Sequence, residues 1–378
     1  MIKKRALLLV ALMLFGNAPI AHGAVKAGDS CKVIGVSTKI KGKSYKCVLL
    51  KGKKILQLTQ ATKNNKPSLP AKPAVVSYST LGLSSEISLK AFNSLTTYLD
   101  KQPELSAGEV ILELSPKASK SLADATFLDM QKGFRFWQSY TPRTTKIRMV
   151  FADRSDLDWF KSTMIRIQPG NQDWLPRIYD LATSNPKNAF AGSQGFDSEG
   201  NALFFYLPGT DTTPTSPGWQ GVGPHEWTHF AQLALSGDIY KVPCWFKEGQ
   251  ATYYGNAISN KEISNWAKIS KNQIGSLKSD FPQFYDFNET SLRKWFSEHE
   301  LDMPNNVCGP DGAFVIGALA TEYLAGTIGV EGIHTFETNL KSGMNWKDSL
   351  SQVTGKSFEP LMDEIVSFTL KQRIWSQS

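Results

Sequence analysis

Hydrophobic residues follow helical and strand-like spacing in turn along the middle of the chain. Apolar positions at helical spacing predict helices over 84–100, 118–139, 156–164 and 173–183, and alternating or short apolar runs predict strands over 146–152, 188–192 and 202–207. From Gly221 onward, helix-like segments separated by Gly, Pro and Asn follow one another. We therefore expect an α+β domain, with a mixed-sheet half followed by a helical half.

The region before residue 81 has a different pattern. Short β-prone runs at 32–36, 44–50 and 54–58 are broken by Gly and Lys, and they predict a small β module over residues 24–60. Residues 61–80 carry three prolines among Lys, Asn and Ser, which is the composition of a semi-extended linker. The predicted domain of residues 81–378 follows.

The first 23 residues have the features of a secretory signal peptide. Three basic residues at 3–5 precede the apolar run 6–15, and Ala21 and Gly23 supply the small side chains that signal peptidase recognises. We expect cleavage before Ala24, and the alternative is an uncleaved anchor. The mature protein is then secreted, either free outside the cell or associated with the cell wall.

No membrane span is expected after the signal peptide is removed. The most apolar later run, 314–325, is interrupted by Thr321 and Glu322, and it falls short of the ~20 apolar residues that a bilayer requires. With 378 residues and 41% hydrophobic composition, the chain can bury a full core. We therefore predict a soluble mature protein.

Positive charge is concentrated in the N-terminal module. Between residues 25 and 75 there are 12 lysines and a single acid, Asp29, whereas the whole chain carries a net charge of only +8. Such a module could bind anionic cell-wall polymers, although a solvated charged surface explains the lysines equally well. Aromatic residues interleaved with the basic ones, expected in a nucleic-acid-binding patch, are missing. Nucleic acid is therefore not an expected partner.

The four cysteines fall into two pairs by region, Cys31 with Cys47 and Cys244 with Cys308. Three pairings are formally possible, and a secreted protein favours disulfides within each region. A cysteine-ligated metal site is the alternative, but no C-x-x-C spacing supports it.

The segment that carries chemistry is His225-Glu226-Trp227-Thr228-His229, inside an apolar helical pattern that ends at Gly237. Four residues make about one helical turn, so both imidazoles project from the same face and can bind one zinc ion. Glu226 is not spaced for ligation, and it can instead accept a proton from a metal-bound water. A buried structural histidine pair is the alternative, which does not explain the intervening glutamate.

A zinc site needs a third protein ligand after His229. The metzincin pattern would require Gly at 232 and His at 235, where this chain has Gln232 and Leu235. A glutamate, Glu248, instead follows His229 after 18 residues, within the segment W-F-K-E-G-Q-A. The alternative is that Glu248 only caps a helix or forms a salt bridge. His299 and His334 are competing ligands, which we expect to be surface residues.

H-E-x-x-H followed after 18 residues by W-x-x-E-G-x-A resembles the gluzincins of the peptidase MA, aminopeptidase-N-like group. The resemblance implies a zincin-like fold over residues 81–378 and a peptide or protein substrate. It also implies that His225, His229 and Glu248 bind Zn²⁺ and that Glu226 is the catalytic base. Gly249 and Ala251 are small enough to let the Glu248 helix pack closely on the metal helix.

Departures from the family pattern limit what the resemblance implies. No G-x-M-E-N motif lies between 188 and 223, so exopeptidase activity is not implied. Phe314 stands where the family often has an oxyanion-stabilising tyrosine, and Tyr323 should face away from the site. Either Tyr253, Tyr254 or a backbone N–H then supplies that contact, or turnover is slow.

Two further expectations concern the walls of the site. The strand at 202–207 lies where gluzincins have an edge strand that pairs with the substrate, but a plain core strand fits its large apolar side chains equally well. A disulfide between Cys244 and Cys308 would fix two walls of the cleft.

Two functions follow from these patterns. The first is a secreted zinc-dependent peptidase that hydrolyses peptide bonds with a metal-activated water. The alternative is a cell-envelope binding protein whose zincin domain is degenerate and inactive. Phe314, in place of the family tyrosine, is the feature that supports this alternative.

Overall fold

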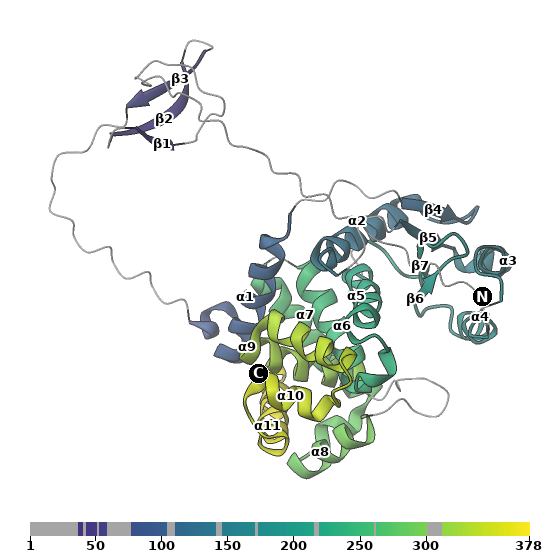
Figure 1. Ribbon diagram of the computed structural model, residues 1–378. Coiled ribbons are helices and arrows are strands. Elements are labelled where there is room, and N and C mark those ends of the chain that lie inside the picture. The colour runs from purple at the N-terminus through teal and green to yellow at the C-terminus, as the bar shows by residue number, and fades with distance from the viewer. Residues whose placement is uncertain are drawn as a thin grey trace, which may run out of the picture. The chain divides into compact units, whose positions relative to one another are not determined.

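The structure is a computed structural model. It describes residues 37–40, 43–50, 53–58, 77–103, 110–140, 146–170, 173–214, 219–260, 262–300 and 312–378. Contacts divide the chain into two compact units, Met1–Val75 and Val76–Ser378 (Figure 1), and the division falls inside the predicted linker. The predicted signal peptide and the predicted strand at 32–36 lie outside the described residues.

The first unit contains a three-stranded antiparallel sheet. Its strands, in spatial order, are β1 (Ser37–Ile40), β2 (Lys43–Leu50) and β3 (Lys53–Leu58). The second and third correspond to predicted runs, whereas β1 was not predicted. Cys47 in β2 is buried and is not a free thiol, but Cys31 lies outside the described residues, so their pairing stays a prediction.

The second unit begins with a four-stranded mixed sheet. Its strands are β4 (Val110–Leu114), β5 (Ile147–Phe151), β6 (Phe190–Phe196) and β7 (Ala202–Leu207). The spatial order is β4-β5-β7-β6, with β4, β5 and β7 parallel and β6 antiparallel to β7. Strand β7 is therefore an interior strand, and the edge beside it is β6. The edge-strand expectation for 202–207 is wrong.

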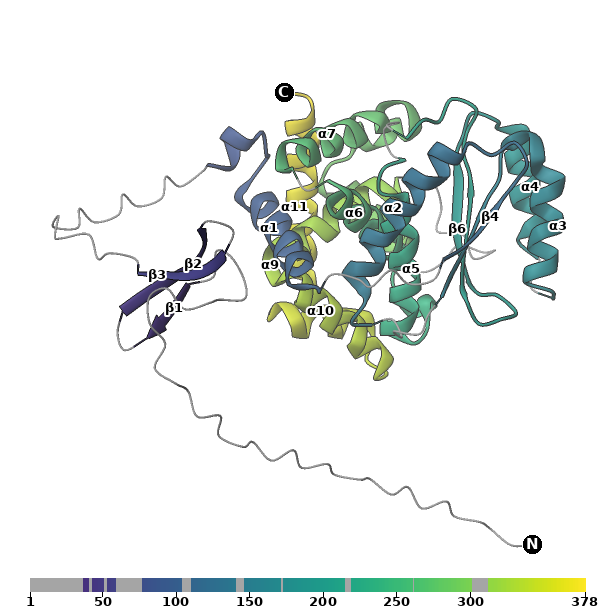
Figure 2. The ribbon, with the colours of Figure 1, turned by 90° about the horizontal axis from the view of Figure 1, so that it is seen from above.

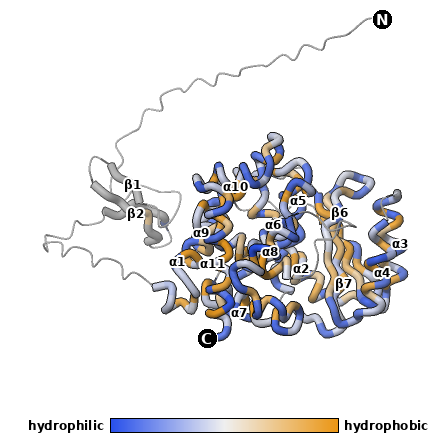
Figure 3. Tube along the Cα trace, turned by 90° about the horizontal axis from the view of Figure 1, so that it is seen from below, coloured by the Kyte–Doolittle hydropathy of each residue, from blue (hydrophilic) through white to orange (hydrophobic). Residues whose placement is uncertain are grey.

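Helices cover both faces of this sheet (Figure 2). They are α2 (Lys120–Trp137) and α5 (Val222–Ser236) on one face, and α3 (Leu157–Ile167) and α4 (Leu175–Ser184) on the other. Alternate side chains of the interior strands join two separate cores, as Phe204 and Phe205 do. Burial on both faces explains why β7 is hydrophobic along its whole length (Figure 3).

The remaining elements of the second unit are helical. They are α1 (Glu86–Lys101), α6 (Cys244–Ser259), α7 (Ile263–Asp280), α8 (Glu289–Glu298), α9 (Ala313–Lys341), α10 (Trp346–Thr354) and α11 (Phe358–Ser376). Short 3-10 helices lie at Tyr78–Leu81, Arg154–Asp156, Ile239–Lys241 and Pro282–Asp286. The described residues after Gly221 form no strand, which confirms the predicted order of a sheet half and then a helical half.

Helix α9 is the central helix of the second half and packs against α1, α6, α10 and α11. With 29 residues it is longer than the apolar run recognised in the sequence, and by length and composition it could cross a membrane. However, 67% of its most apolar stretch is buried inside the unit, as in a core helix. Gly329, at φ 72°, interrupts its helical geometry.

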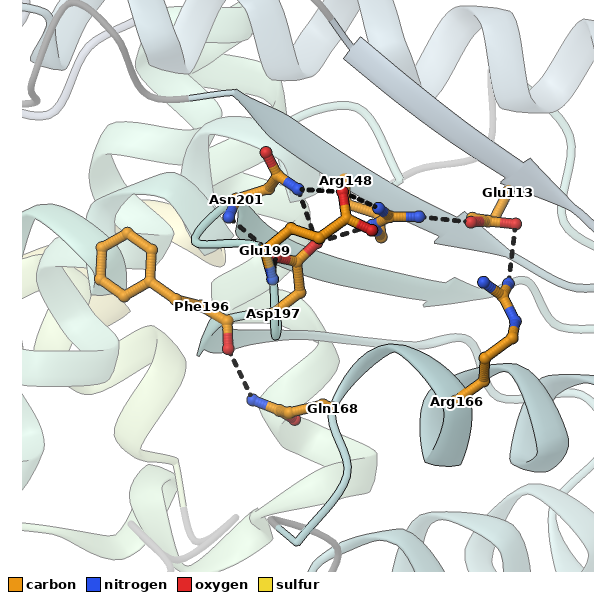
Figure 4. Close-up of polar contacts among 8 residues, drawn as sticks. All are labelled: Glu113, Arg148, Arg166, Gln168, Phe196, Asp197, Glu199 and Asn201. Atoms are coloured by element: carbon orange, nitrogen blue, oxygen red, sulfur yellow. Dashed lines mark hydrogen bonds and ion pairs between the residues drawn. The ribbon is translucent and has the colours of Figure 1, made fainter.

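A buried arginine fixes the turn between β6 and β7 (Figure 4). The Nε of Arg148 lies 2.6 Å from Oδ2 of Asp197, and its other nitrogens contact Glu113 at 2.5 Å and Glu199 at 3.0 Å. Oδ1 of Asp197 accepts hydrogen bonds from the backbone N–H groups of Glu199 and Asn201. These contacts tie the hairpin to β5, and so position the edge strand β6.

Candidate metal and catalytic site

Helix α5 places both predicted histidine ligands on one face. It ends at Gly237 as predicted, where φ is 72° and the backbone N–H donates to the carbonyl of Leu233. The Nε2 atoms of His225 and His229 lie 3.2 Å apart, because four residues bring the side chains one turn above each other.

Helix α6 brings the third predicted ligand to the same point. Pro243 is the N-cap of this helix, which begins at Cys244. Oε2 of Glu248 lies 3.7 Å from Nε2 of His225 and 3.4 Å from Nε2 of His229. The three ligand atoms all lie within 4.8 Å of one another. The structure therefore brings together all three residues selected from the sequence.

The spacing of these atoms fits a single tetrahedral ion. Zn–N and Zn–O bonds of ~2.0–2.1 Å place two ligand atoms of a tetrahedron about 3.3 Å apart. The three observed separations of 3.2, 3.4 and 3.7 Å scatter around that value. Two imidazole nitrogens and one carboxylate oxygen are also the donor set of a catalytic zinc site, which leaves a fourth position for water or substrate.

Glycines allow the two ligand helices to approach each other. A Cβ on Gly255 would lie 2.5 Å from the carbonyl oxygen of Gly221 and 3.1 Å from Cβ of His225. Gly249 was expected to have this role, but a Cβ there would lie 2.1 Å from the backbone carbon of Gly317 in α9. The expectation for Gly249 is wrong, because this residue faces α9 rather than α5.

A glutamine that was missed as a site residue holds His229. Nδ1 of His229 lies 2.9 Å from Oε1 of Gln232, whose Nε2 donates to the carbonyl oxygen of Lys247 at 2.9 Å and to Oε1 of Gln250 at 2.6 Å. Gln232 is fully buried. The available sequence signal was its position three residues after His229, on the same helix face.

Glu226 is buried beside the predicted metal ligands. It lines the same cleft as the three ligands, and the backbone N–H of Ser193 in β6 donates a hydrogen bond to its carboxylate. Burial raises the pKa of Glu226 to about 7, against a partial opposing effect of His229. A buried carboxyl with this pKa can change its protonation state near neutral pH.

The two histidines of the site have opposite pKa shifts. Burial and, to a smaller extent, the neighbouring His229 lower the pKa of His225 to about 3, against an opposing effect of Glu248. Burial would also lower the pKa of His229, but the carboxylate of Glu248 outweighs it and raises the value to about 9. Burial would raise the pKa of Glu248, yet His229 outweighs that effect and lowers it to about 2.

The site opens into a cleft of about 750 Å³. One wall is the edge strand β6, and further lining residues come from α4, α5, α6, α7, α9 and the 3-10 helix Ile239–Lys241. The ring of Phe314 stacks on that of His225, with 6.0 Å between the centroids, and is 42% exposed. Phe314 thus borders the metal ligands, in keeping with the position assigned to it from the sequence.

No tyrosine is present among the described residues that line this cleft. Tyr253 and Tyr254 were candidates for stabilising an oxyanion, but both are buried in the core and neither lines the cleft. They follow Glu248 by five and six residues, which turns them to other sides of α6. The hydroxyl of Tyr323 contacts Glu364 in α11, which confirms that this residue faces away.

The other two histidines among the described residues lie outside the candidate site. His299 and His334 do not join the ligand cluster. Both are buried, so the expectation that they are surface residues is wrong. His299 stacks on Trp295, and Nδ1 of His334 lies 3.1 Å from the hydroxyl of Tyr140.

Cys244, at the start of α6, is buried and is not a free thiol. Its predicted partner, Cys308, lies outside the described residues, so the disulfide that would fix two walls of the cleft stays a prediction.

Comparison of the chain with protein-family models, with curated proteins and with solved structures finds no match.

Proposed function

We propose that the protein is a zinc-dependent peptidase with a zincin-like catalytic domain. The observation that carries this proposal is the meeting of the ligand atoms of His225, His229 and Glu248 at separations suited to one zinc ion. These residues come from two helices and match a metallopeptidase motif in sequence. A second buried carboxylate, Glu226, lies in the same cleft without taking part in the ligand cluster.

The protein residues have separate tasks in this proposal. Zinc held by His225, His229 and Glu248 would supply a Lewis acid and would lower the pKa of a water there. Glu226 is the residue that would hold a proton on its carboxylate and return it to the nitrogen of the leaving amine. The Ser193 N–H holds the Glu226 carboxylate in position, and Gln232 orients the ring of His229.

The position of β6 favours an extended peptide as the substrate. This strand is at the edge of the sheet and lines the cleft that contains the metal ligands. A free strand edge offers backbone N–H and C=O groups that can pair with a peptide, while side-chain pockets provide selectivity. Because the described cleft residues include no tyrosine, we propose that a backbone N–H group donates to the oxyanion.

The N-terminal region adds two proposals that depend on sequence alone. The signal-like segment supports export from the cell, and the lysine-rich module supports attachment to an anionic wall polymer.

The experiment is to measure zinc content and proteolysis for the wild type, for Glu226→Gln and for the control Glu322→Gln. The control makes the same change at a buried glutamate in α9, outside the ligand cluster. We expect one zinc per chain in all three proteins and a large loss of proteolysis only in Glu226→Gln. Wild-type protein that retains no zinc would contradict the proposal. Zinc without any proteolysis would favour the binding protein with an inactive zincin domain.

A further inference from the structure

A fully buried acid in α9 is connected to the metal site through two glutamines. Oε2 of Glu337 accepts a hydrogen bond from Nε2 of Gln250 at 3.1 Å. Oε1 of Gln250 accepts from Nε2 of Gln232 at 2.6 Å, and Oε1 of Gln232 lies 2.9 Å from Nδ1 of His229. The side chains of Gln232, Gln250 and Glu337 are all fully buried.

The direction of these hydrogen bonds is fixed by chemistry. The carbonyl oxygen of Lys247 can only accept, so the amide group that faces it in Gln232 must be the NH₂. The oxygen of Gln232 then faces His229, whose Nδ1 must carry a proton. The second N–H of Gln232 requires an acceptor, so the oxygen of Gln250 faces it and the NH₂ of Gln250 faces Glu337. Each step therefore requires the next, and the last acceptor is Glu337.

We propose that Glu337 is a remote positioning residue of the metal site. By holding Gln250 and Gln232 in one orientation, it keeps the proton of His229 on Nδ1 and leaves Nε2 to bind the metal. The inference rests on the proposed zinc site. A hydrogen-bonded partner on the far nitrogen of a ligating histidine fixes its orientation and its basicity. Here that partner is the neutral side chain of Gln232, and Gln250 connects Gln232 to the acid Glu337.

Position in the fold supports this role. Gln250 belongs to the same helix as Glu248, and Gln232 belongs to the same helix as His229. The contact with Glu337 therefore connects both ligand helices to α9. Burying a polar group costs free energy unless it is hydrogen-bonded. Removing the acceptor would leave the NH₂ of Gln250 without this partner, so the amide would reorient and weaken the restraint on Gln232.

The test compares two buried glutamates of the same helix in the full chain. Glu322 is as deeply buried as Glu337, but it hydrogen-bonds to Ser88 and does not touch the glutamines. Zinc dissociation constants are measured by competition with a chromophoric chelator. We expect Glu337→Met to bind zinc about 10-fold more weakly, which is the lower end of the effect of outer partners of metal ligands. Glu322→Met should bind zinc as the wild type does.

A conservative variant separates hydrogen bonding from packing. Glu337→Gln retains an acceptor oxygen and should keep the zinc affinity close to that of the wild type. Proton exchange of the His229 Nδ1–H group, followed by NMR in the metal-free protein, is a second readout. It should be slow in the wild type, Glu322→Met and Glu337→Gln, and faster in Glu337→Met. If Glu337→Met does not fold, Gln250→Met breaks the same chain of contacts and replaces it.

The proposal is overturned if Glu337→Met, or Gln250→Met in its place, matches Glu322→Met in both zinc affinity and Nδ1–H exchange. Wild-type protein that binds no zinc would overturn the proposed function instead. In that case the Nδ1–H exchange of the metal-free proteins still decides whether Glu337 positions His229.

Discussion

The second unit contains two clusters of charged groups, around Arg148 and around Glu248, that differ in how their atoms are paired. Around Arg148, a guanidinium with several N–H donors meets carboxylates, so donors face acceptors and opposite charges adjoin. In the metal cluster, the nitrogens of His225 and His229 and an oxygen of Glu248 face one another. One cluster is complete within the protein, whereas the other presents three electron-pair donors to one point.

The pKa shifts follow the same distinction. Burial would raise the pKa of Asp197, but hydrogen bonds from Asn201 and Arg148 outweigh it and lower the value. At the metal cluster, His225 and His229 are shifted in opposite directions, although they are the same kind of side chain one helical turn apart. Buried charged groups therefore do not by themselves identify a functional site. The candidate metal cluster is distinguished by electron-pair donor atoms that converge on one point.

The largest effect is expected from Glu226→Gln, which should lower kcat/KM for peptide hydrolysis by about 10²–10⁴-fold, the usual contribution of a general base. Zinc content should not change, because Glu226 is outside the ligand cluster. Steady-state kinetics with metal analysis of the same samples provides the measurement. Equal activity in the two proteins would remove Glu226 from the mechanism.

Removing the arginine of the complete cluster should act on stability instead. Arg148→Met leaves the buried carboxylate of Asp197 without its charged partner and should lower the free energy of unfolding by about 3–5 kcal/mol. Arg166 also contacts Glu113, but its side chain is 59% exposed, so Arg166→Met should cost no more than about 1 kcal/mol. Urea denaturation measures both. Equal losses in the two variants would contradict the importance given to burial.

A smaller effect is expected at the glutamine beside His229. Gln232→Met should weaken zinc binding by about 10–100-fold, because the ring of His229 loses the partner that orients it. Gln372→Met makes the same change at a buried glutamine in α11 and should leave zinc affinity unchanged. Chelator competition compares the two. Similar zinc affinities would show that the hydrogen bond to His229 has no role in binding.

The effect that is smallest per pH unit concerns the pH dependence of stability. Burial raises the pKa of Glu322 to about 8, so the folded state holds this proton more tightly than the unfolded chain, where the pKa is 4.5. The resulting stability is present below pH 4.5 and is lost as pH rises towards 8, at no more than about 1.4 kcal/mol per pH unit. Glu322→Gln should flatten the curve of unfolding free energy over this range. An unchanged slope would contradict the burial of an ionisable group there.

Much of the site could be predicted because its residues follow short, regular spacings in the sequence. A spacing of four positions from His225 to His229 fixes a common helix face, and the motif around Glu248 selects a carboxylate that the structure places against both histidines. The strand at 202–207 was located because burial on both faces makes it continuously hydrophobic. Strand β4 was missed, because a short apolar run does not distinguish a strand from a helix.

The features that escaped prediction depend on distant contacts. The order of strands in space makes β6 the edge, although β7 is closer in sequence to the metal helix. Gly255, rather than Gly249, lies at the crossing of the ligand helices, which depends on how α6 is rotated between α5 and α9. Arg148 and Asp197 are 49 residues apart, and no local pattern connects them.

The most direct test of the central claim is X-ray absorption spectroscopy of the zinc-loaded full chain. We expect a four-coordinate zinc with two imidazoles and oxygen ligands at about 2.0–2.1 Å. His225→Ala and Glu248→Ala should each lose one of the assigned ligands or fail to hold the metal. A spectrum with sulfur ligands, or one that does not change in these variants, would contradict the site.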